Sequence, residues 1–188
     1  MHAIRCILIA LVTMGVVTAA RAQSPMEEMM KKAQPGPQHE LLKEIAGTWN
    51  YRLTDYMSGT PQTSNGTATS AMILGGRFLK VETFGTMMGM SANTFSMMGF
   101  DNRNGKYFMW EVDEMGTYSV FAEGTYDAAS RKLTLRGENE EEGQKVPFRF
   151  TYTMIDKDHF TFEIAFSLGS AGKPMEQKVL EIAYTRAS

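Results

Sequence analysis

The sequence predicts an all-β fold: an antiparallel up-and-down β-barrel of about 8–10 strands, preceded by a short helical lead-in. Three observations support this prediction. From residue 49 onward, apolar and polar residues alternate in successive segments, as they do in strands with one buried face. Short stretches rich in Gly, Asn and Asp separate the segments, so consecutive strands must be antiparallel. A meander of this many strands has to curl, and closure into a barrel also removes its exposed edges.

The first 22 residues are predicted to be a cleaved secretory signal peptide. Arg5 supplies the positive start, residues 6–17 form an apolar core, and residues 20–22 form a small-x-small site, so cleavage is expected after Ala22. The apolar core is shorter than the roughly 20 residues that a membrane-spanning helix needs. We therefore expect a periplasmic or secreted protein with no transmembrane segment after cleavage.

Cleavage also removes the only cysteine, Cys6, so disulfides, a thiol nucleophile and Cys-type metal sites are excluded for the mature chain. Two arginines are lost with the signal peptide, which leaves four more acidic than basic residues. A nucleic-acid partner is not expected, because such proteins carry clustered basic charge. The remaining length fits one domain that buries a substantial core.

Residues 23–37 form a short helix and linker in this interpretation. Ser24, Pro25 and Glu27 match a capping box with proline in the first turn, and Pro35-Gly36-Pro37 ends the segment. The segment could dock on a partner, cover the barrel mouth or form a mobile tail. The single barrel domain is expected over residues 38–188.

A second helix is predicted over residues 39–45. Leu41, Leu42 and Ile45 lie on one stripe of that helix, and Gly47 is placed to end it. After Trp49 the apolar period changes from about 3.6 to 2, which marks the first strand.

The clearest strands are residues 146–154, 160–168 and 180–186. A barrel of about eight strands is either filled by side chains or holds one small ligand, and the sequence leaves both readings open. An aromatic lining suits an apolar molecule, with tyrosine hydroxyls to orient it. The predicted ligand-binding residues, which share the inward faces, are Phe148, Phe150, Tyr152, Phe160, Phe162, Phe166, Tyr184 and Met109.

The segment Gly47-Thr48-Trp49, directly after a helical turn, resembles the opening of lipocalin-like barrels. In that group a basic residue near the final strand covers the tryptophan, and the resemblance assigns this position to Arg186. It implies a structural role, closure of the barrel end, for Gly47, Trp49 and Arg186. A guanidinium over an indole contributes roughly 0.5–2 kcal/mol.

A wider set of motifs resembles the bacterial domain-of-unknown-function 1579 family. The motifs occur in order over nearly all of the mature chain: His39-Glu40-x-Leu42, Gly47-Thr48-Trp49, Leu74-Gly75-Gly76-Arg77-Phe78-Leu79, Gly99-Phe100-Asp101 before Lys106-Tyr107, and Gly124-Thr125-Tyr126-Asp127. The resemblance implies a lipocalin-like barrel in a secreted or periplasmic protein and implies no reaction. The chain lacks the disulfides of lipocalins, so lipocalin ligands are not carried over.

The sequence predicts no catalytic residues, no metal site and no cofactor. Only His39 and His159 remain after cleavage, too few and too far apart for a zinc pattern, and His39-Glu40 are adjacent helix residues that do not face each other. Methionine is unusually frequent, with 16 in the chain. Thioethers bind Cu(I), but methionine also fills cores and lines adaptable pockets. Copper binding would require three or more to converge among Met87, Met88, Met90, Met97, Met98 and Met109.

The leading hypothesis is therefore a module that binds a small apolar molecule inside the barrel. An enzyme, a hydrolase or isomerase, could use the same pocket, and a buried carboxylate with a strongly shifted pKa among Glu82, Glu111 and Glu123 would favour it. Copper binding by methionine is a third hypothesis. The fourth, a packed interaction module, would show a filled interior and an apolar patch outside. Ligand identity and oligomeric state stay open.

Overall fold

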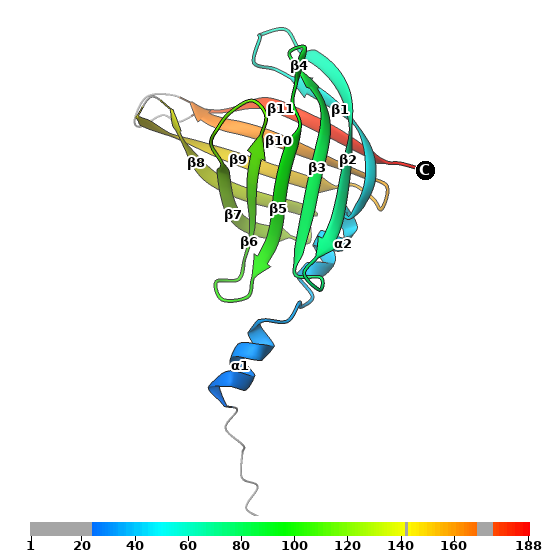
Figure 1. The fold of residues 1–188 in the computed structure, drawn as a ribbon. Coiled ribbons are helices and arrows are strands. Elements are labelled where there is room, and N and C mark those ends of the chain that lie inside the picture. The colour runs from blue at the N-terminus through cyan, green and yellow to red at the C-terminus, as the bar shows by residue number, and fades with distance from the viewer. Residues whose placement is uncertain (1–23, 142, 169–174) are drawn as a thin grey trace, which may run out of the picture.

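A computed structural model describes residues 24–141, 143–168 and 175–188 (Figure 1). The predicted signal peptide lies outside the described residues. Two helices precede the barrel, α1 (Pro25–Lys32) and α2 (His39–Ile45). The predicted capping box of α1 is present, since Ser24 and Glu27 each accept a hydrogen bond from the other's backbone N–H. Neither described helix has the length and apolar character needed to cross a membrane.

The rest of the described chain is β-structure, as predicted. The strands are β1 (Gly47–Asp55), β2 (Gln62–Ile73), β3 (Phe78–Met87), β4 (Met90–Ser91), β5 (Thr94–Asp101), β6 (Lys106–Asp113), β7 (Val120–Asp127), β8 (Lys132–Glu141), β9 (Gln144–Met154), β10 (His159–Leu168) and β11 (Met175–Arg186). Every pairing is antiparallel, and the order runs β2-β1-β11-β10-β9-β8-β7-β6-β5-β3. Pairing of β2 with β3 closes the sheet into a ten-stranded barrel, while the two-residue β4 pairs only with the end of β3.

The first and last strands lie side by side in this barrel. In their register Trp49 is opposite Arg186 and Tyr51 is opposite Tyr184. The inward residues of β1 alternate with outward polar ones, which is the period-2 pattern seen in the sequence. The strands predicted at 146–154, 160–168 and 180–186 are all present, and β9 and β11 begin a few residues earlier than predicted.

Helix α2 closes one end of the barrel. Leu41, Leu42 and Ile45 are buried there, and α2 packs against β2, β3 and β5. Figure 1 places α2 at one end of the barrel and the β3–β4 hairpin at the other. The two ends therefore differ: α2 covers one, and no described helix covers the other, the open end of the described barrel.

Helix α1 lies beyond the α2 end. Arg77 donates to the Ala33 carbonyl at 2.9 Å and Asn102 donates to the Lys32 carbonyl at 2.8 Å, which ties the end of α1 to the barrel. None of the residues of α1 is buried. The helix therefore does not cover the open mouth, which was one of the roles considered for it.

Candidate functional site

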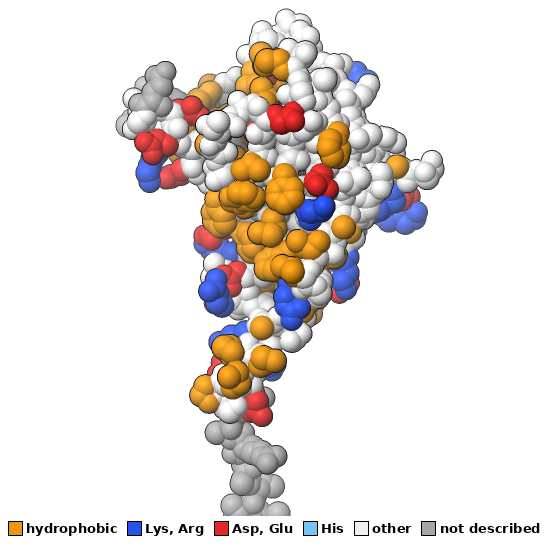
Figure 2. All heavy atoms as spheres, in the orientation of Figure 1, with side chains coloured by type: hydrophobic (Ala, Val, Ile, Leu, Met, Phe, Trp, Pro, Cys, Tyr) orange, Lys and Arg blue, Asp and Glu red, His pale blue; other side chains and the backbone are white. Residues whose placement is uncertain are grey.

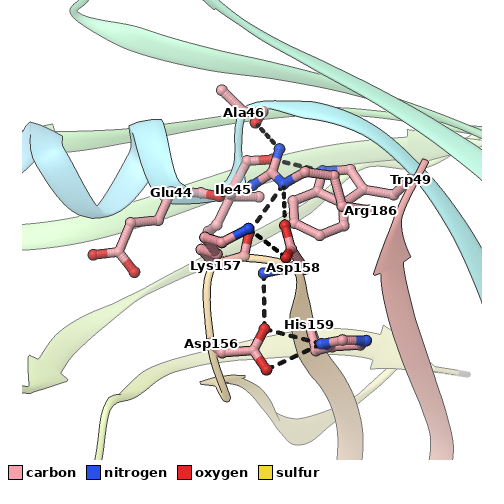
Figure 3. Close-up of polar contacts among 9 residues, drawn as sticks. All are labelled: Glu44, Ile45, Ala46, Trp49, Asp156, Lys157, Asp158, His159 and Arg186. Atoms are coloured by element: carbon pink, nitrogen blue, oxygen red, sulfur yellow. Dashed lines mark hydrogen bonds and ion pairs between the residues drawn. The ribbon is translucent and has the colours of Figure 1, made fainter. Parts of the chain in front are cut away.

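The predicted closing residues meet at the α2 end (Figure 3). The Arg186 guanidinium lies 4.0 Å from the centre of the Trp49 ring. It also donates to the backbone carbonyls of Glu44, Ala46 and Lys157 at 2.9–3.0 Å. The indole N–H of Trp49 donates to the Ile45 carbonyl at 2.9 Å. All polar groups of this cluster are thus used to hold chain segments together, which supports a structural role.

Gly47 makes room for that guanidinium. Its φ of 141° is a conformation that residues with a side chain rarely adopt, and a Cβ atom at this position would overlap the Arg186 guanidinium. Glycine is therefore needed here for both the backbone and the space.

The predicted lining residues face inward, and in the half of the barrel near α2 Phe160, Tyr152 and Tyr184 pack tightly around Trp49. Phe160 stacks on Tyr184 with ring centres 4.3 Å apart, and Tyr152 lies 4.6 Å from Phe162. The Tyr152 hydroxyl donates to the Met109 sulfur at 3.2 Å. A space of only about 20 Å³ remains beside Trp49 and Phe160. This half of the interior is a packed core with too little room for an organic ligand.

A larger cavity of about 140 Å³ lies in the other half of the barrel interior. Of the eight predicted ligand-binding residues, Tyr152, Phe162 and Tyr184 line it. Phe148, Phe150, Phe160, Phe166 and Met109 belong to or pack against the core instead. The further apolar lining residues, which come from strands all around the barrel, include Leu53, Val81, Met87, Ile164, Leu180 and Ile182.

Two carboxyl groups project into this apolar cavity. Glu111 and Asp113 are two residues apart on β6, on the same inward face as the buried Tyr107 and Met109. Burial, and secondarily the negative charge of Asp113, raises the pKa of Glu111 to about 7 from its ordinary 4.5. Glu111 is consequently poised to gain or lose a proton near neutral pH.

Hydroxyl groups complete the polar part of the cavity. Thr83 and Thr94 bond to each other at 2.8 Å. Ser96 and Tyr184 also line the cavity, so their hydroxyl groups add to its polar wall.

Of the three carboxylates considered for catalysis, only Glu111 faces the interior. Glu82 forms an ion pair with Lys80 at 2.8 Å, and Glu123 forms one with Lys106; both pairs are partly exposed to solvent. Among the described residues, the polar cavity wall is thus built on β1, β3, β5, β6, β9 and β11 rather than on the histidines or on the acidic β8–β9 hairpin.

The histidines have local structural contacts. His39 is buried, and its Nδ1 accepts a hydrogen bond from the Gly36 N–H at 3.0 Å. His159 lies at the start of β10, where its Nδ1 is 2.9 Å from Asp156 (Figure 3). Neither residue lines the open cavity.

The six methionines considered for copper lie in different places. Met98 and Met109 are opposite each other on β5 and β6 and are buried in the core. Met97, one residue on, points to the opposite face of β5. At the β3–β4 hairpin, Met87 lines the cavity, whereas Met88 and Met90 are exposed. The convergence of three that copper binding would require is not found among these residues.

Outside the barrel, hydrophobic side chains gather over the sheet formed by β3, β5, β6 and β7 (Figure 2). Phe95 packs against Trp110 at 6.3 Å between ring centres, and Phe108 stacks on Phe121 at 6.2 Å. Phe84 and Phe121 are about half exposed. An outer apolar patch is one of the two features expected of a packed interaction module, but the cavity means that the interior is not filled.

Fold and site together define a lipocalin-like antiparallel β-barrel, packed at one end and hollow at the other, where carboxyl and hydroxyl groups face an apolar space. The family model described as "Protein of unknown function (DUF1579)" matches residues 34–186, and the chain belongs to this family. This confirms the family resemblance noted in the sequence. A search of curated proteins finds no match.

Two solved structures show what the fold is similar to. The crystal structure of Rv2717c from M. tuberculosis has a TM-score of 0.58 and 15% sequence identity, and the match covers 82% of this chain and all of that one. A redesigned β-barrel has a TM-score of 0.44 and 13% identity, over 79% of this chain and 96% of that one. At this identity the likeness to Rv2717c shows the barrel fold alone.

Proposed function

We propose that this protein is a periplasmic or secreted binding module that holds a small, mostly apolar molecule in the open end of its barrel. The observation that carries the proposal is the cavity of about 140 Å³, which combines apolar walls with a few convergent polar groups. Ligand sites typically have this composition, since apolar walls supply affinity and a few polar groups fix orientation. The proposed periplasmic or secreted localisation rests on the signal peptide that is predicted to end at Ala22.

The size of the cavity limits the ligand. An apolar cavity of about 150 Å³ in another protein accepts benzene, so a group of one aromatic ring fits here. Larger molecules would have to extend out through the open end. Tyr152, Phe162 and Tyr184 offer ring faces to such a group.

The test is a binding measurement with a matched pair of variants. Ala92 lines the cavity and is partly exposed, so Ala92→Phe places a ring in the space with little disturbance of the core. Ala183 lies on the exposed face of β11, and Ala183→Phe adds the same ring outside. Native mass spectrometry of protein purified from its own compartment should detect an organic ligand on the wild type and on Ala183→Phe, and not on Ala92→Phe.

Benzyl alcohol gives a second readout that does not depend on a retained natural ligand. Titration followed by two-dimensional NMR should shift the signals of cavity residues in the wild type and in Ala183→Phe. Equal shifts in Ala92→Phe, or no shift in any of the three proteins together with no co-purified molecule, would argue against a binding cavity.

An enzyme is the second candidate, favoured specifically by Glu111. A carboxyl group with a pKa of about 7 in a cavity can act as a general acid or base at neutral pH. If the natural ligand is converted, Glu111→Gln should abolish turnover even at ligand concentrations that saturate the variant. If the ligand is chemically unchanged after prolonged incubation with the wild-type protein, the enzyme candidate is rejected and binding is the function.

A further inference from the structure

The open cavity is lined by acidic groups without a basic counterpart. Glu111 and Asp113 are the charged side chains of its lining, and no lysine, arginine or histidine is among the described residues that line it. This arrangement is unusual, because carboxylates that lose part of their contact with water are normally paired with a cation or fully hydrogen-bonded. Asp113 accepts a hydrogen bond from the Met115 N–H at 2.7 Å, but in the described chain neither carboxyl group has a protein cation within ion-pair distance.

The neighbouring hollow at the same end repeats this charge pattern. It shares Leu53 with the cavity and contains Asp55, the next inward residue of β1. Asp55 is 1% exposed; one of its oxygens accepts from the Met57 N–H at 2.8 Å, and the other has no partner in the described chain. The open half of the barrel therefore contains three inward carboxyl groups on two strands.

From these groups we infer that the ligand of the open cavity is a small organic cation: an ammonium group facing Glu111 and Asp113, attached to an apolar body about the size of one aromatic ring. The inference rests on the proposed binding function and names the chemical class of its ligand. Charge complementarity favours a positively charged ligand, because a carboxylate ligand would meet two like charges in a space of low polarity.

Other groups of the cavity fit the same ligand. The hydroxyl oxygens of Ser96 and Tyr184, which also line the cavity, can accept hydrogen bonds from the ammonium N–H donors that the carboxylates leave free. The rings of Tyr152, Phe162 and Tyr184 can pack against the apolar body, and aromatic faces also attract cations. The cavity thus provides acceptors for an ammonium group and apolar contact for the rest of the molecule.

Three probes of similar size test the inference: benzylamine, benzyl alcohol and benzoate. Each has one benzene ring, and its polar substituent is positive, neutral or negative, respectively. Dissociation constants are measured by calorimetric or NMR titration at pH 7.5, with methylamine as a probe that has the charge but no ring. We expect benzylamine to bind about tenfold more tightly than benzyl alcohol. Benzoate and methylamine should bind most weakly.

The matched variants locate the effect. Glu111→Gln combined with Asp113→Asn keeps shape and removes both charges, and it should bring benzylamine to the affinity of benzyl alcohol. Glu114→Gln is the control, because Glu114 is exposed just beyond the end of β6 and does not line this cavity. It removes one charge at the same end of the barrel and should retain the preference. Circular dichroism establishes that each variant is folded.

Each alternative result has a distinct meaning. If the wild type binds benzyl alcohol as tightly as benzylamine, the cation inference is overturned while the binding function stands. If the double variant keeps the preference for benzylamine, the charge does not lie at Glu111 and Asp113, and the inference is again overturned. If none of the aromatic probes binds, the inference is overturned, and the proposed function fails with it when no organic molecule co-purifies either.

Discussion

The Arg186 guanidinium covers the indole of Trp49 at 4.0 Å, and so joins the last strand of the barrel to the first. Its nitrogens also bind carbonyls of α2, of the α2–β1 junction and of the β9–β10 turn (Figure 3). One side chain thus ties together segments that lie about 140 residues apart in the chain. Because the contact is distant in sequence, its loss should affect global stability rather than a single loop.

Arg186→Lys should therefore lower the free energy of unfolding by about 2 kcal/mol, although the charge is kept. The planar fork that donates in several directions is lost, and a lysine cannot replace those hydrogen bonds. Urea unfolding measures the change. Arg52→Lys on the exposed face of β1 is the control and should stay within about 0.5 kcal/mol of wild type. An Arg186→Lys variant as stable as this control would contradict the closing role.

Gly47→Ala tests the space beneath the guanidinium. The added methyl group should cost about 2 kcal/mol or more, from the backbone conformation and from overlap with Arg186. Gly59→Ala isolates the backbone part, since Gly59 also has a positive φ (79°) and no atom lies within 4 Å of the point that an added Cβ would occupy. If overlap with Arg186 is the larger cause, Gly47→Ala should lower the free energy of unfolding clearly less in an Arg186→Ala background than in the wild type. Losses of unfolding free energy that simply add would refute the overlap as the cause.

The pKa of Glu111 predicts how stability depends on pH. The folded state holds this proton up to about pH 7, whereas an exposed glutamate releases it near 4.5. Between those values the folded state binds more protons, so wild-type stability should fall as pH rises, relative to Glu111→Gln, by as much as about 3 kcal/mol. Below pH 4.5 and above pH 7 the difference in stability between the two proteins should no longer change with pH. Urea unfolding from pH 4 to 8 measures it.

Glu114 provides an internal contrast for that experiment. Its pKa is lowered, chiefly by a hydrogen bond from Ser91, so its contribution is present above its ordinary pKa and is lost as pH falls. Relative to Glu114→Gln, wild-type stability should therefore change with pH in the opposite direction. If stability changes with pH in the same direction relative to both variants, the effect comes from removing a negative charge in general and not from the burial of Glu111.

The barrel and its closed end could be predicted from the sequence because their signals are local. Alternation in β9, β10 and β11 fixed which residues face inward, and Gly47-Thr48-Trp49 marked the first strand. The pairing of Trp49 with Arg186 came from the family resemblance, and in the structure the guanidinium lies over the indole. The strand pattern depends on residue type and period, which a single sequence contains, whereas the pairing of Trp49 with Arg186 is distant in sequence and needed the resemblance.

The open cavity could not be predicted in the same way, and β6 shows why. Its two faces carry Tyr107, Met109, Glu111 and Asp113 on one side and Phe108, Trp110 and Val112 on the other. Hydrophobicity alone would turn the second set inward, yet these residues cover the outside of the barrel. Met109 was assigned to the interior, and the period of 2 then places Glu111 and Asp113 there as well. The volume left between strands depends on long-range packing, which the sequence does not express.

Binding of a cationic probe should itself depend on pH through Glu111. The titratable groups that line the cavity with it are Asp113 on β6, Tyr51 on β1, Tyr152 on β9 and Tyr184 on β11, and burial raises the pKa of all three tyrosines. The tyrosines therefore stay neutral near pH 7, where Glu111 changes charge. An ammonium probe favours the ionised carboxylate, so the affinity for benzylamine should increase several-fold from pH 6 to 8 and then level off. Binding should release a proton near pH 7, which calorimetry in buffers of different ionisation enthalpy detects.

Two controls separate this effect from a general change with pH. The affinity for benzyl alcohol should not increase over this range, and Glu111→Gln should bind benzylamine equally at pH 6 and pH 8. A wild-type affinity for benzylamine that does not change between these pH values would exclude Glu111 as the group that meets the cation.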